Sequence, residues 1–217
     1  MAKPGQPSRP RSDHSGPETG TRQALVDAAI ETLHEEGFAG ASARAIARRA
    51  GCNQALVFYY FGSVVDLLLA ALDAVSQARF VRYSAAVEVV TNPADLLAVA
   101  VDVFREDLDA GYATVLVEMI AGASSTPGLG AEVARRIAPW ADFAESAVSS
   151  ALADSPLRAM VPTGEVAHAI VALYLGLEML ANLDGDRGRA TALFGHLALL
   201  VSAFKALSPR LMQRENR

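Results

Sequence analysis

The sequence has few of the residues and motifs on which enzymes and metal sites depend. Its 217 residues include one cysteine, Cys52, which excludes an intrachain disulfide and any metal site built from several cysteines. The histidines are scattered, and there is no HExxH pair, no GxSxG turn and no glycine-rich phosphate loop. We therefore expect no catalytic residue, no metal and no cofactor, and an enzyme is the less favoured class of function.

What is present favours an all-α protein. Hydrophobic residues make up 52% of the chain and charged residues only 20%, and apolar residues recur at helical spacing from Thr21 onward. No strand pattern competes with this spacing. Residues 1–20 are rich in Pro, Gly, Ser and Arg and lack the apolar segment of a secretion signal, so they are predicted to form a disordered basic arm. We expect a cytoplasmic protein.

The longest apolar stretches, 161–183 and 190–207, raise the question of a membrane span. They contain Glu178, His168, His196 and Lys205 and are flanked by ordinary turn residues. Long helices that are apolar all round are usually buried in soluble proteins, so we expect no membrane association.

The distribution of charge points to one segment. The net charge of −5 and the pI of 5.4 are unusual for a nucleic-acid binder, because neutralised phosphates supply most of the non-specific affinity. Between Gly37 and Val65, however, the only charged residues are Arg44, Arg48 and Arg49. This segment is locally basic, and it is where DNA is expected to lie.

Three stop or turn signals divide the same region into short helices. The first helix is expected from Thr21 or Arg22 to Glu36, ended by Gly37. Its apolar stripe consists of Leu25, Ala28, Ala29, Thr32 and Leu33.

Caps mark the next three helices. Ser42 is predicted to cap a short helix that reaches Ala50, with Ile46 and Ala47 facing inward, and Gly51 supplies a tight turn. Asn53 can cap a third helix reaching Tyr60, and Ser63 a fourth that begins after Gly62. Three turns in so short a span predict three short helices packed against one another.

The rest of the chain is predicted to be helical as well. Breaks with Pro, Gly, Asn and Asp separate expected helices at 93–110, 112–121, 129–153, 162–182 and 186–207. The domain boundary is placed inside the fourth helix, between Asp66 and Phe80.

The stretch from Ser42 to Phe61 resembles the DNA-binding motif of tetracycline-repressor (TetR) family regulators. The matching features are Ile46-Ala47, Ala50-Gly51, the small residues around Asn53, and the aromatic close from Phe58 to Phe61 followed by Ser63 and Leu67-Leu68. The resemblance covers about the first third of the chain. It implies a three-helix helix-turn-helix DNA-binding domain at 21–66, a helical ligand-binding and dimerisation domain at 67–207, and a flexible tail at 208–217.

In this interpretation the N-terminal turn of the recognition helix lies in the major groove. Gln54 has an amide side chain of the kind that pairs with adenine. For Asn53 there are two alternatives: it caps the helix, or it contacts DNA. Helical spacing places Val57, Tyr60 and Phe61 on the inner face and leaves Phe58 and Tyr59 exposed. The predicted DNA-contacting residues are Arg22, Ser42, Arg44, Asn53, Gln54, Ala55, Phe58, Tyr59 and Ser63.

One feature departs from the family. Gly62 stands where members commonly carry a lysine, and the stretch from Cys52 to Val65 contains no basic residue. We therefore expect weak phosphate anchoring from this stretch and a shallow salt dependence of operator binding. Arg44, the helix N-termini at Ser42 and Ser63, and the arm residues Lys3, Arg9 and Arg11 are the alternative anchors.

For the second domain, the resemblance implies an effector pocket. The candidate lining residues are Phe104, Tyr112, Glu118, Met119, Trp140, Phe143, Tyr174 and Glu178. Most aromatic side chains of this kind simply pack a core. Glu118 and Glu178 are more informative, because a carboxylate in an apolar run is unfavourable unless it is paired or solvated. Either can bind a cationic or hydroxyl-bearing ligand, or pair with a residue such as Arg135 or Arg136.

The last helices are apolar on more than one face, which predicts a second partner. A homodimer joined through a four-helix bundle is expected, with an interface containing Leu173, Leu177, Leu193, Leu197, Leu200 and Phe204. The resemblance thus implies a repressor that a small, largely apolar molecule releases from double-stranded operator DNA. A helical ligand-binding or interaction protein without DNA binding is the alternative.

Overall fold

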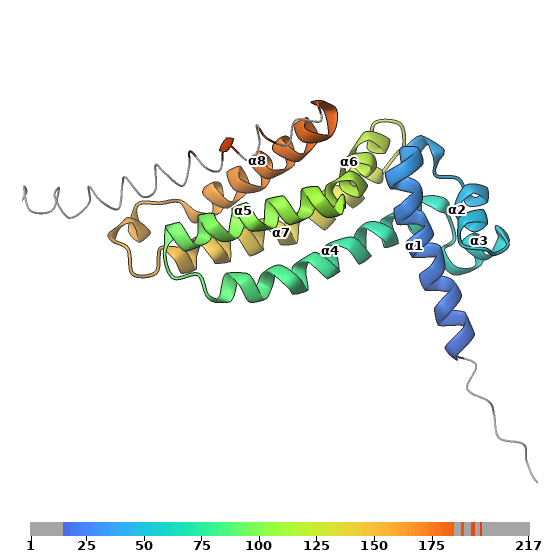
Figure 1. The fold of residues 1–217 in the computed structure, drawn as a ribbon, viewed down its shortest axis with the longest axis horizontal. Helices are drawn as coiled ribbons and strands as arrows, with labels where there is room; N and C mark the ends of the chain where they lie inside the picture. Colours follow the sequence, from blue (N-terminus) through green and yellow to red (C-terminus); the bar gives the residue numbers. More distant parts are fainter. Residues whose placement is uncertain (1–14, 185–187, 189–191, 194–195, 197–217) are drawn as a thin grey trace, which may run out of the picture.

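The computed structural model of the protein describes residues 15–184, 188, 192–193 and 196. They form eight α-helices and one short 3₁₀ helix, with no strand among them (Figure 1). The bounds are α1 Ser15–Gly40, α2 Ala43–Arg49, α3 Ala55–Phe61, α4 Val64–Glu88, α5 Pro93–Ala110, α6 Tyr112–Ala123, α7 Leu129–Ala151, η1 Pro156–Ala159 and α8 Thr163–Asp184. The predicted fold class, all-α with a helix-turn-helix ahead of a helical domain, is confirmed.

Helix α1 begins earlier than predicted, at Ser15, so Arg22 lies within the helix and not at its start. The predicted stop at Gly37 is confirmed, because this residue has φ 70° and ψ −177° and breaks the helical path before a last turn to Gly40. A positive φ of this size favours glycine. The predicted apolar stripe of α1 is buried throughout, including the Thr32 side chain, whose hydroxyl donates to the Ala28 carbonyl.

Helices α2 and α3 follow the predicted caps closely. The Ser42 hydroxyl accepts a hydrogen bond from the Ala45 amide at 3.2 Å, and Ile46 and Ala47 are buried. Gly51 turns the chain with φ 65°. These short helices place Val57 in the core, where it packs with residues of α1 and α4.

Helix α4 is continuous across the expected domain boundary, and the hydrophobic core is continuous across it as well. One buried cluster joins α1, α2, α3 and the first half of α4 to Val115 and Met119 of α6 and to Leu129 and Val133 of α7. The helix-turn-helix therefore shares its apolar core with the start of the second domain, and the two cannot move independently without disturbing this packing.

The remaining helices lie as a bundle extending away from α1–α3 (Figure 1). The prediction for α5 is confirmed at both ends, and those for α6, α7 and α8 are confirmed within two residues. The predicted helix 186–207 lies almost wholly outside the described residues, as do the arm residues Lys3, Arg9 and Arg11 and the 208–217 tail.

Helix α8 has an unusual surface. It packs mainly against α7, and its stretch Thr163–Ala181 is long and apolar enough to cross a membrane by length and composition, yet only 17% of it is buried. Ile170, Leu173 and Leu180 are exposed on α8. This exposed apolar face needs a partner that the described residues do not provide.

Candidate DNA-binding surface and regulatory core

The N-terminal turn of α3 is exposed at the outer end of the molecule. The Asn53 carboxamide oxygen accepts a hydrogen bond from the amide of Ala55, the first residue of α3, at 2.8 Å, although the residue at the N-cap position is Gln54 and not Asn53 as predicted. Gln54 and Ala55 are exposed, and the Gln54 side chain makes no cap. The turn therefore presents an amide side chain next to a small one, as major-groove readout requires.

The aromatic residues of α3 divide as predicted between core and solvent. Val57 is buried and Tyr60 and Phe61 are half-buried, whereas Phe58 is 52% and Tyr59 73% exposed. Tyr60 holds Tyr59 from one side, edge to face at 5.0 Å between ring centroids. The exposed Arg22 guanidinium lies 4.9 Å from the Phe61 ring centroid, which brings α1 next to the end of α3.

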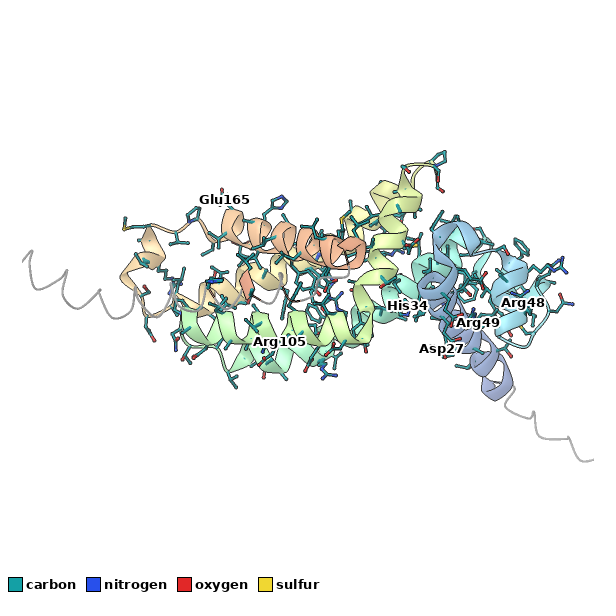
Figure 2. The ribbon with its side chains drawn as sticks, turned by 45° about the horizontal axis from the view of Figure 1, so that its top comes forward. Asp27, His34, Arg48, Arg49, Arg105 and Glu165 are labelled. Carbon is teal, nitrogen blue, oxygen red and sulfur yellow. The ribbon has the colours of Figure 1, made fainter. Side chains whose placement is uncertain are left out.

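The three arginines of α2 have different surroundings. Arg44 and Arg48 are exposed, and Figure 2 shows Arg48 at the outer end of the molecule, far from Arg105 and Glu165. Arg49 instead bonds to Glu35 at 2.6 Å and Glu36 at 3.2 Å, with Glu31 at 3.6 Å. The hydrogen bond to Glu35 raises the pKa of Arg49. Three carboxylates of α1 therefore neutralise Arg49, so it adds less to the local basic charge than the sequence indicates.

Gly62 and Ser63 form the junction between α3 and α4. Ser63 caps α4 as predicted, accepting from the Asp66 amide at 3.0 Å while its hydroxyl donates to the Asp66 carboxylate at 2.6 Å. Gly62 has φ 82°, so a lysine at this position would be strained. The missing basic residue is thus tied to a backbone turn that favours glycine.

Comparison with known proteins supports this geometry. The family model described as bacterial regulatory proteins, tetR family, matches residues 25–71. Residues 25–71, which include α2 and α3, therefore match the DNA-binding domain of this family. The chain is also similar to the HTH-type transcriptional regulator BetI of Rhizobium meliloti, 42% identical over 57 residues, and to that of Agrobacterium fabrum, 48% identical over 48 residues. These matches cover 26% and 22% of this chain and only 28% and 23% of those relatives.

Solved structures share the whole TetR-like fold. The regulator FadR from Bacillus halodurans superposes with a TM-score of 0.71 at 16% identity, covering 87% of this chain and 96% of that one. FadR from Bacillus subtilis, solved in complex with stearoyl-CoA, gives 0.70 at 15% identity, covering 82% and 96%. A TetR-family regulator from Cytophaga hutchinsonii gives 0.70 at 16% identity, covering 86% and 95%. At these identities the likeness extends to the fold alone.

Helix α6 is hydrogen-bonded directly to the end of α1. The Glu118 carboxylate accepts a hydrogen bond from the Phe38 amide at 2.8 Å, just after the break at Gly37. The Phe38 ring occupies the space left by Gly122, where an added Cβ would lie 2.5 Å from the ring. The ion pair suggested for Glu118 with Arg135 or Arg136 is not found. Both arginines bond to Glu132, and Arg136 also bonds to Asp73.

A buried polar network lies deeper in the bundle, and sequence analysis missed most of it. Asp107 of α5 is fully buried and accepts hydrogen bonds from Arg79 and Tyr83 of α4 and from Tyr174 of α8. Arg79 also donates to the Tyr174 hydroxyl at 2.6 Å and lies 5.0 Å from the Trp140 ring centroid. The available signal was spacing, since Asp107 falls on the same helical face as the buried Phe104 and Arg79 on that of the buried Val75 and Tyr83.

Glu178 lies beside this network without joining it. Its side chain is 1% exposed, and neither carboxylate oxygen has a hydrogen-bond partner. Burial raises the pKa of Glu178 to about 7, with Asp107 adding to the rise and Tyr174 and Arg79 opposing it. A buried, unpaired carboxylate is rare in folded proteins, and each example calls for an explanation.

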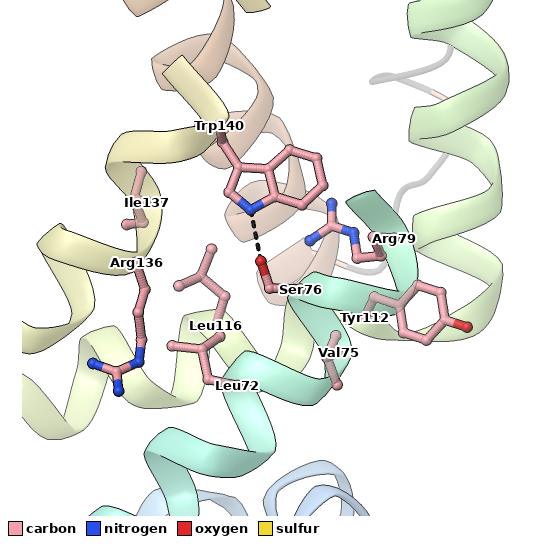
Figure 3. A pocket seen from close by; sticks show the side chains of 9 residues that line it. All are labelled: Leu72, Val75, Ser76, Arg79, Tyr112, Leu116, Arg136, Ile137 and Trp140. Atoms are coloured by element: carbon pink, nitrogen blue, oxygen red, sulfur yellow. Dashed lines mark hydrogen bonds between the residues drawn. The ribbon is translucent and has the colours of Figure 1, made fainter. Parts of the chain in front are cut away.

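A small cavity adjoins the network on the α6 side (Figure 3). It holds about 20 Å³, room for a water-sized molecule, and Figure 3 shows the Trp140 indole donating to the Ser76 hydroxyl at its edge, at 2.8 Å. The lining residues are Leu72, Val75, Ser76 and Arg79 of α4, Tyr112 and Leu116 of α6, and Arg136, Ile137 and Trp140 of α7.

The predicted pocket residues do not gather at one place. Tyr112 and Trp140 line the cavity, and Phe143 lies against Trp140 at 5.9 Å between centroids. Phe104 of α5 and Tyr174 of α8 form an edge-to-face pair at 5.8 Å between ring centroids, and Tyr174 lies four positions before Glu178. Met119 is fully buried in the core shared with the helix-turn-helix.

Only part of the predicted dimer face is described. Leu173 is 43% exposed and Leu177 half-buried, and Leu193 is half-buried. Leu197, Leu200 and Phe204 lie outside the described residues.

Proposed function

We propose that this protein is a homodimeric transcriptional regulator, a cytoplasmic repressor that a small, largely apolar effector releases from double-stranded operator DNA. The observation that carries the proposal is the exposed N-terminal turn of α3, with Gln54 and Tyr59 in solvent above a buried Val57, within a domain matched by the TetR model. The DNA-contacting set is Arg22, Ser42, Arg44, Asn53, Gln54, Ala55, Phe58, Tyr59 and Ser63. Residues 21–66 form the DNA-binding unit and 67–207 the effector and dimer unit.

Two features support a dimer. The exposed apolar side chains Ile170, Leu173 and Leu180 follow one another at helical spacing along α8. Near them, the side-chain position of Gly176 has no atom within 4 Å, which leaves room for a second helix to approach. A dimer also places two recognition helices about 34–36 Å apart, in successive major grooves.

The contact between α6 and α1 supplies a route from effector to DNA. Helix α6 lines the cavity with Tyr112 and Leu116 and holds the end of α1 with Glu118. At about 20 Å³ the cavity is too small to hold an effector, so the route requires an effector bound within the bundle to displace α4, α6 and α7 relative to one another. Such movement shifts α1 and, with it, the recognition helix. A nearly complete switch requires the effector to prefer one conformation by about 5 kcal/mol.

An electrophoretic shift with DNA from upstream of the protein's own gene tests the proposal. We expect a sequence-selective complex at moderate salt, weakened at least about tenfold by Gln54→Ala or Tyr59→Ala. Arg105→Ala is the matched control, because Arg105 is an exposed side chain in the helical bundle, far from Arg48 of α2 (Figure 2). Absence of any selective complex would favour the alternative of a helical ligand-binding protein without DNA binding. If a selective complex forms, selection of bound genomic DNA defines the operator.

A further inference from the structure

The unpaired carboxylate of Glu178 suggests the chemistry of the effector, an inference that rests on the proposed ligand-responsive function. Glu178 is 1% exposed, and both of its oxygens lack a hydrogen-bond partner. The polar side chains nearest to it bond to one another: Asp107 accepts from Arg79, Tyr83 and Tyr174. The network therefore has no donor left that the described structure assigns to Glu178.

The balance of charge gives the sign of the missing partner. Arg79 and Asp107 neutralise each other in a direct ion pair. An ionised Glu178 then leaves the cluster with one negative charge in surroundings of low polarity, which is strongly unfavourable without a counter-charge. A cation bound at Glu178 would complete a second ion pair, whereas an anion would add to the imbalance.

The packing around Glu178 gives the rest of the ligand. Glu178 lies one turn after Tyr174 and one turn before Ala181, on the face of α8 that packs with Phe104 and Leu108 of α5. The outer part of this α5–α8 seam consists of half-buried side chains, Leu97, Val101, Tyr174 and Leu177. The seam is apolar and includes the Phe104 and Tyr174 rings, and the face of an aromatic ring attracts a cation.

We propose that Glu178 is the anchor of the effector site and that the effector is an organic cation, a protonated primary or secondary amine on an apolar body, which enters along the α5–α8 seam. The ammonium group donates hydrogen bonds to the Glu178 carboxylate, and the apolar body packs against Phe104, Tyr174 and Leu177. Arg79 stays paired with Asp107, so the four charges are matched two by two.

Three probes with the same carbon chain test the charge of the ligand: n-hexylamine, 1-hexanol and hexanoate. The full-length protein is titrated with each at pH 8, following thermal unfolding and the fluorescence of Trp140, the single tryptophan, which stacks on Arg79 of the network. We expect hexylammonium to raise the melting temperature and change the fluorescence at lower concentration than hexanol, and hexanoate to have the smallest effect.

Glu178→Gln keeps the shape and removes the charge, and it is expected to weaken hexylammonium binding by more than about tenfold. Glu165→Gln is the matched control, because Glu165 is an exposed glutamate on the same helix. Equal responses to hexylammonium and hexanoate, or an unchanged hexylammonium response in Glu178→Gln, would overturn the inference.

The operator shift separates this inference from the proposed function. Neither probe assay uses DNA. If the wild-type protein binds its operator but does not bind amines, only the inference about the effector is refuted. If the protein binds hexylammonium through Glu178 but forms no selective DNA complex, only the proposed function is refuted.

Discussion

At the scale of single residues, the surroundings of each arginine decide whether it is available to DNA. Arg44 and Arg49 lie five positions apart around α2, but Arg44 is exposed whereas Arg49 is held by Glu31, Glu35 and Glu36. A guanidinium that already neutralises carboxylates releases few counterions from DNA. The local excess of basic residues in this segment is therefore smaller than its composition indicates.

This difference predicts the salt dependence of operator binding. Each phosphate contact contributes about 0.9 to the slope of log K against log salt, so Arg44→Ala should reduce the slope by about 2 in a dimer with two half-sites. Arg49→Ala should leave the slope nearly unchanged. The measurement is operator affinity at a series of salt concentrations. Equal slope changes for the two variants would show that Arg49 leaves its carboxylates to contact DNA.

Glu178 predicts how stability depends on pH. Burial raises its pKa to about 7, well above the value of about 4.3 in an unfolded chain. Between these values the folded protein holds a proton that the unfolded chain has released, so this group stabilises the fold at low pH and the contribution is lost as pH rises through 7. From pH 5.5 to pH 8 the loss amounts to about 2 kcal/mol.

Urea unfolding of the wild type and of Glu178→Gln at both pH values measures this contribution. The groups that face Glu178, namely Arg79, Asp107 and Tyr174, are present in both proteins, so the difference isolates one carboxyl. We expect the variant to be the more stable protein at pH 8 and the wild type to approach it at pH 5.5. A variant that is less stable at pH 8 would mean that ionised Glu178 has a partner in the folded protein.

At the scale of helices, α6 and α1 are linked by the hydrogen bond from Phe38 to Glu118 and by the packing of the Phe38 ring against Gly122. Glu118→Ala removes the acceptor of the Phe38 amide, and a part-buried amide without a partner costs about 1 to 3 kcal/mol. Glu118→Gln keeps an acceptor and should cost less. Urea unfolding measures the free-energy differences, and the shift assay then reports whether operator affinity follows them.

If Glu118→Ala loses stability but binds the operator as the wild type does, the link is structural and not a route to DNA. Gly122→Val provides an independent check, because its side chain would displace the Phe38 ring while leaving Glu118 intact. Both variants should alter operator affinity in the same direction if α6 sets the position of α1.

The helices themselves could be predicted because their signals are local. Ser42, Ser63 and Gly51 act through neighbouring backbone groups, so caps and turns were located correctly from spacing alone. The start of α1 was predicted too late, because the local sequence Ser15-Gly16-Pro17 is typical of a helix break. Tertiary contacts carry no such local signal: Glu118 meets Phe38 across 80 positions and Arg79 meets Asp107 across 28. The sequence marked Glu118 and Glu178 as unusual but did not identify their partners.

At the scale of the whole molecule, the apolar face of α8 and the shared core determine how two copies can work together. Since α4, α6 and the helix-turn-helix pack into one cluster, a dimer formed through α8 would fix the distance between the two recognition helices through rigid contacts. A small change in the bundle is then transmitted to both DNA-binding units at once. This arrangement makes the dimer part of the regulatory mechanism as well as a source of affinity.

Charge on the α8 face should therefore abolish both assembly and tight DNA binding. Leu173→Glu with Leu180→Glu places two carboxylates on the exposed apolar face, and we expect a monomer in sedimentation and a loss of operator affinity of about 100-fold or more, because the two half-sites are no longer bound by one particle. Val89→Glu is the control, since Val89 is 72% exposed but lies at the end of α4. Circular dichroism checks that each variant is folded. A double variant that remains a dimer would place the interface elsewhere, whereas a folded monomer with wild-type affinity would show that one recognition helix is sufficient.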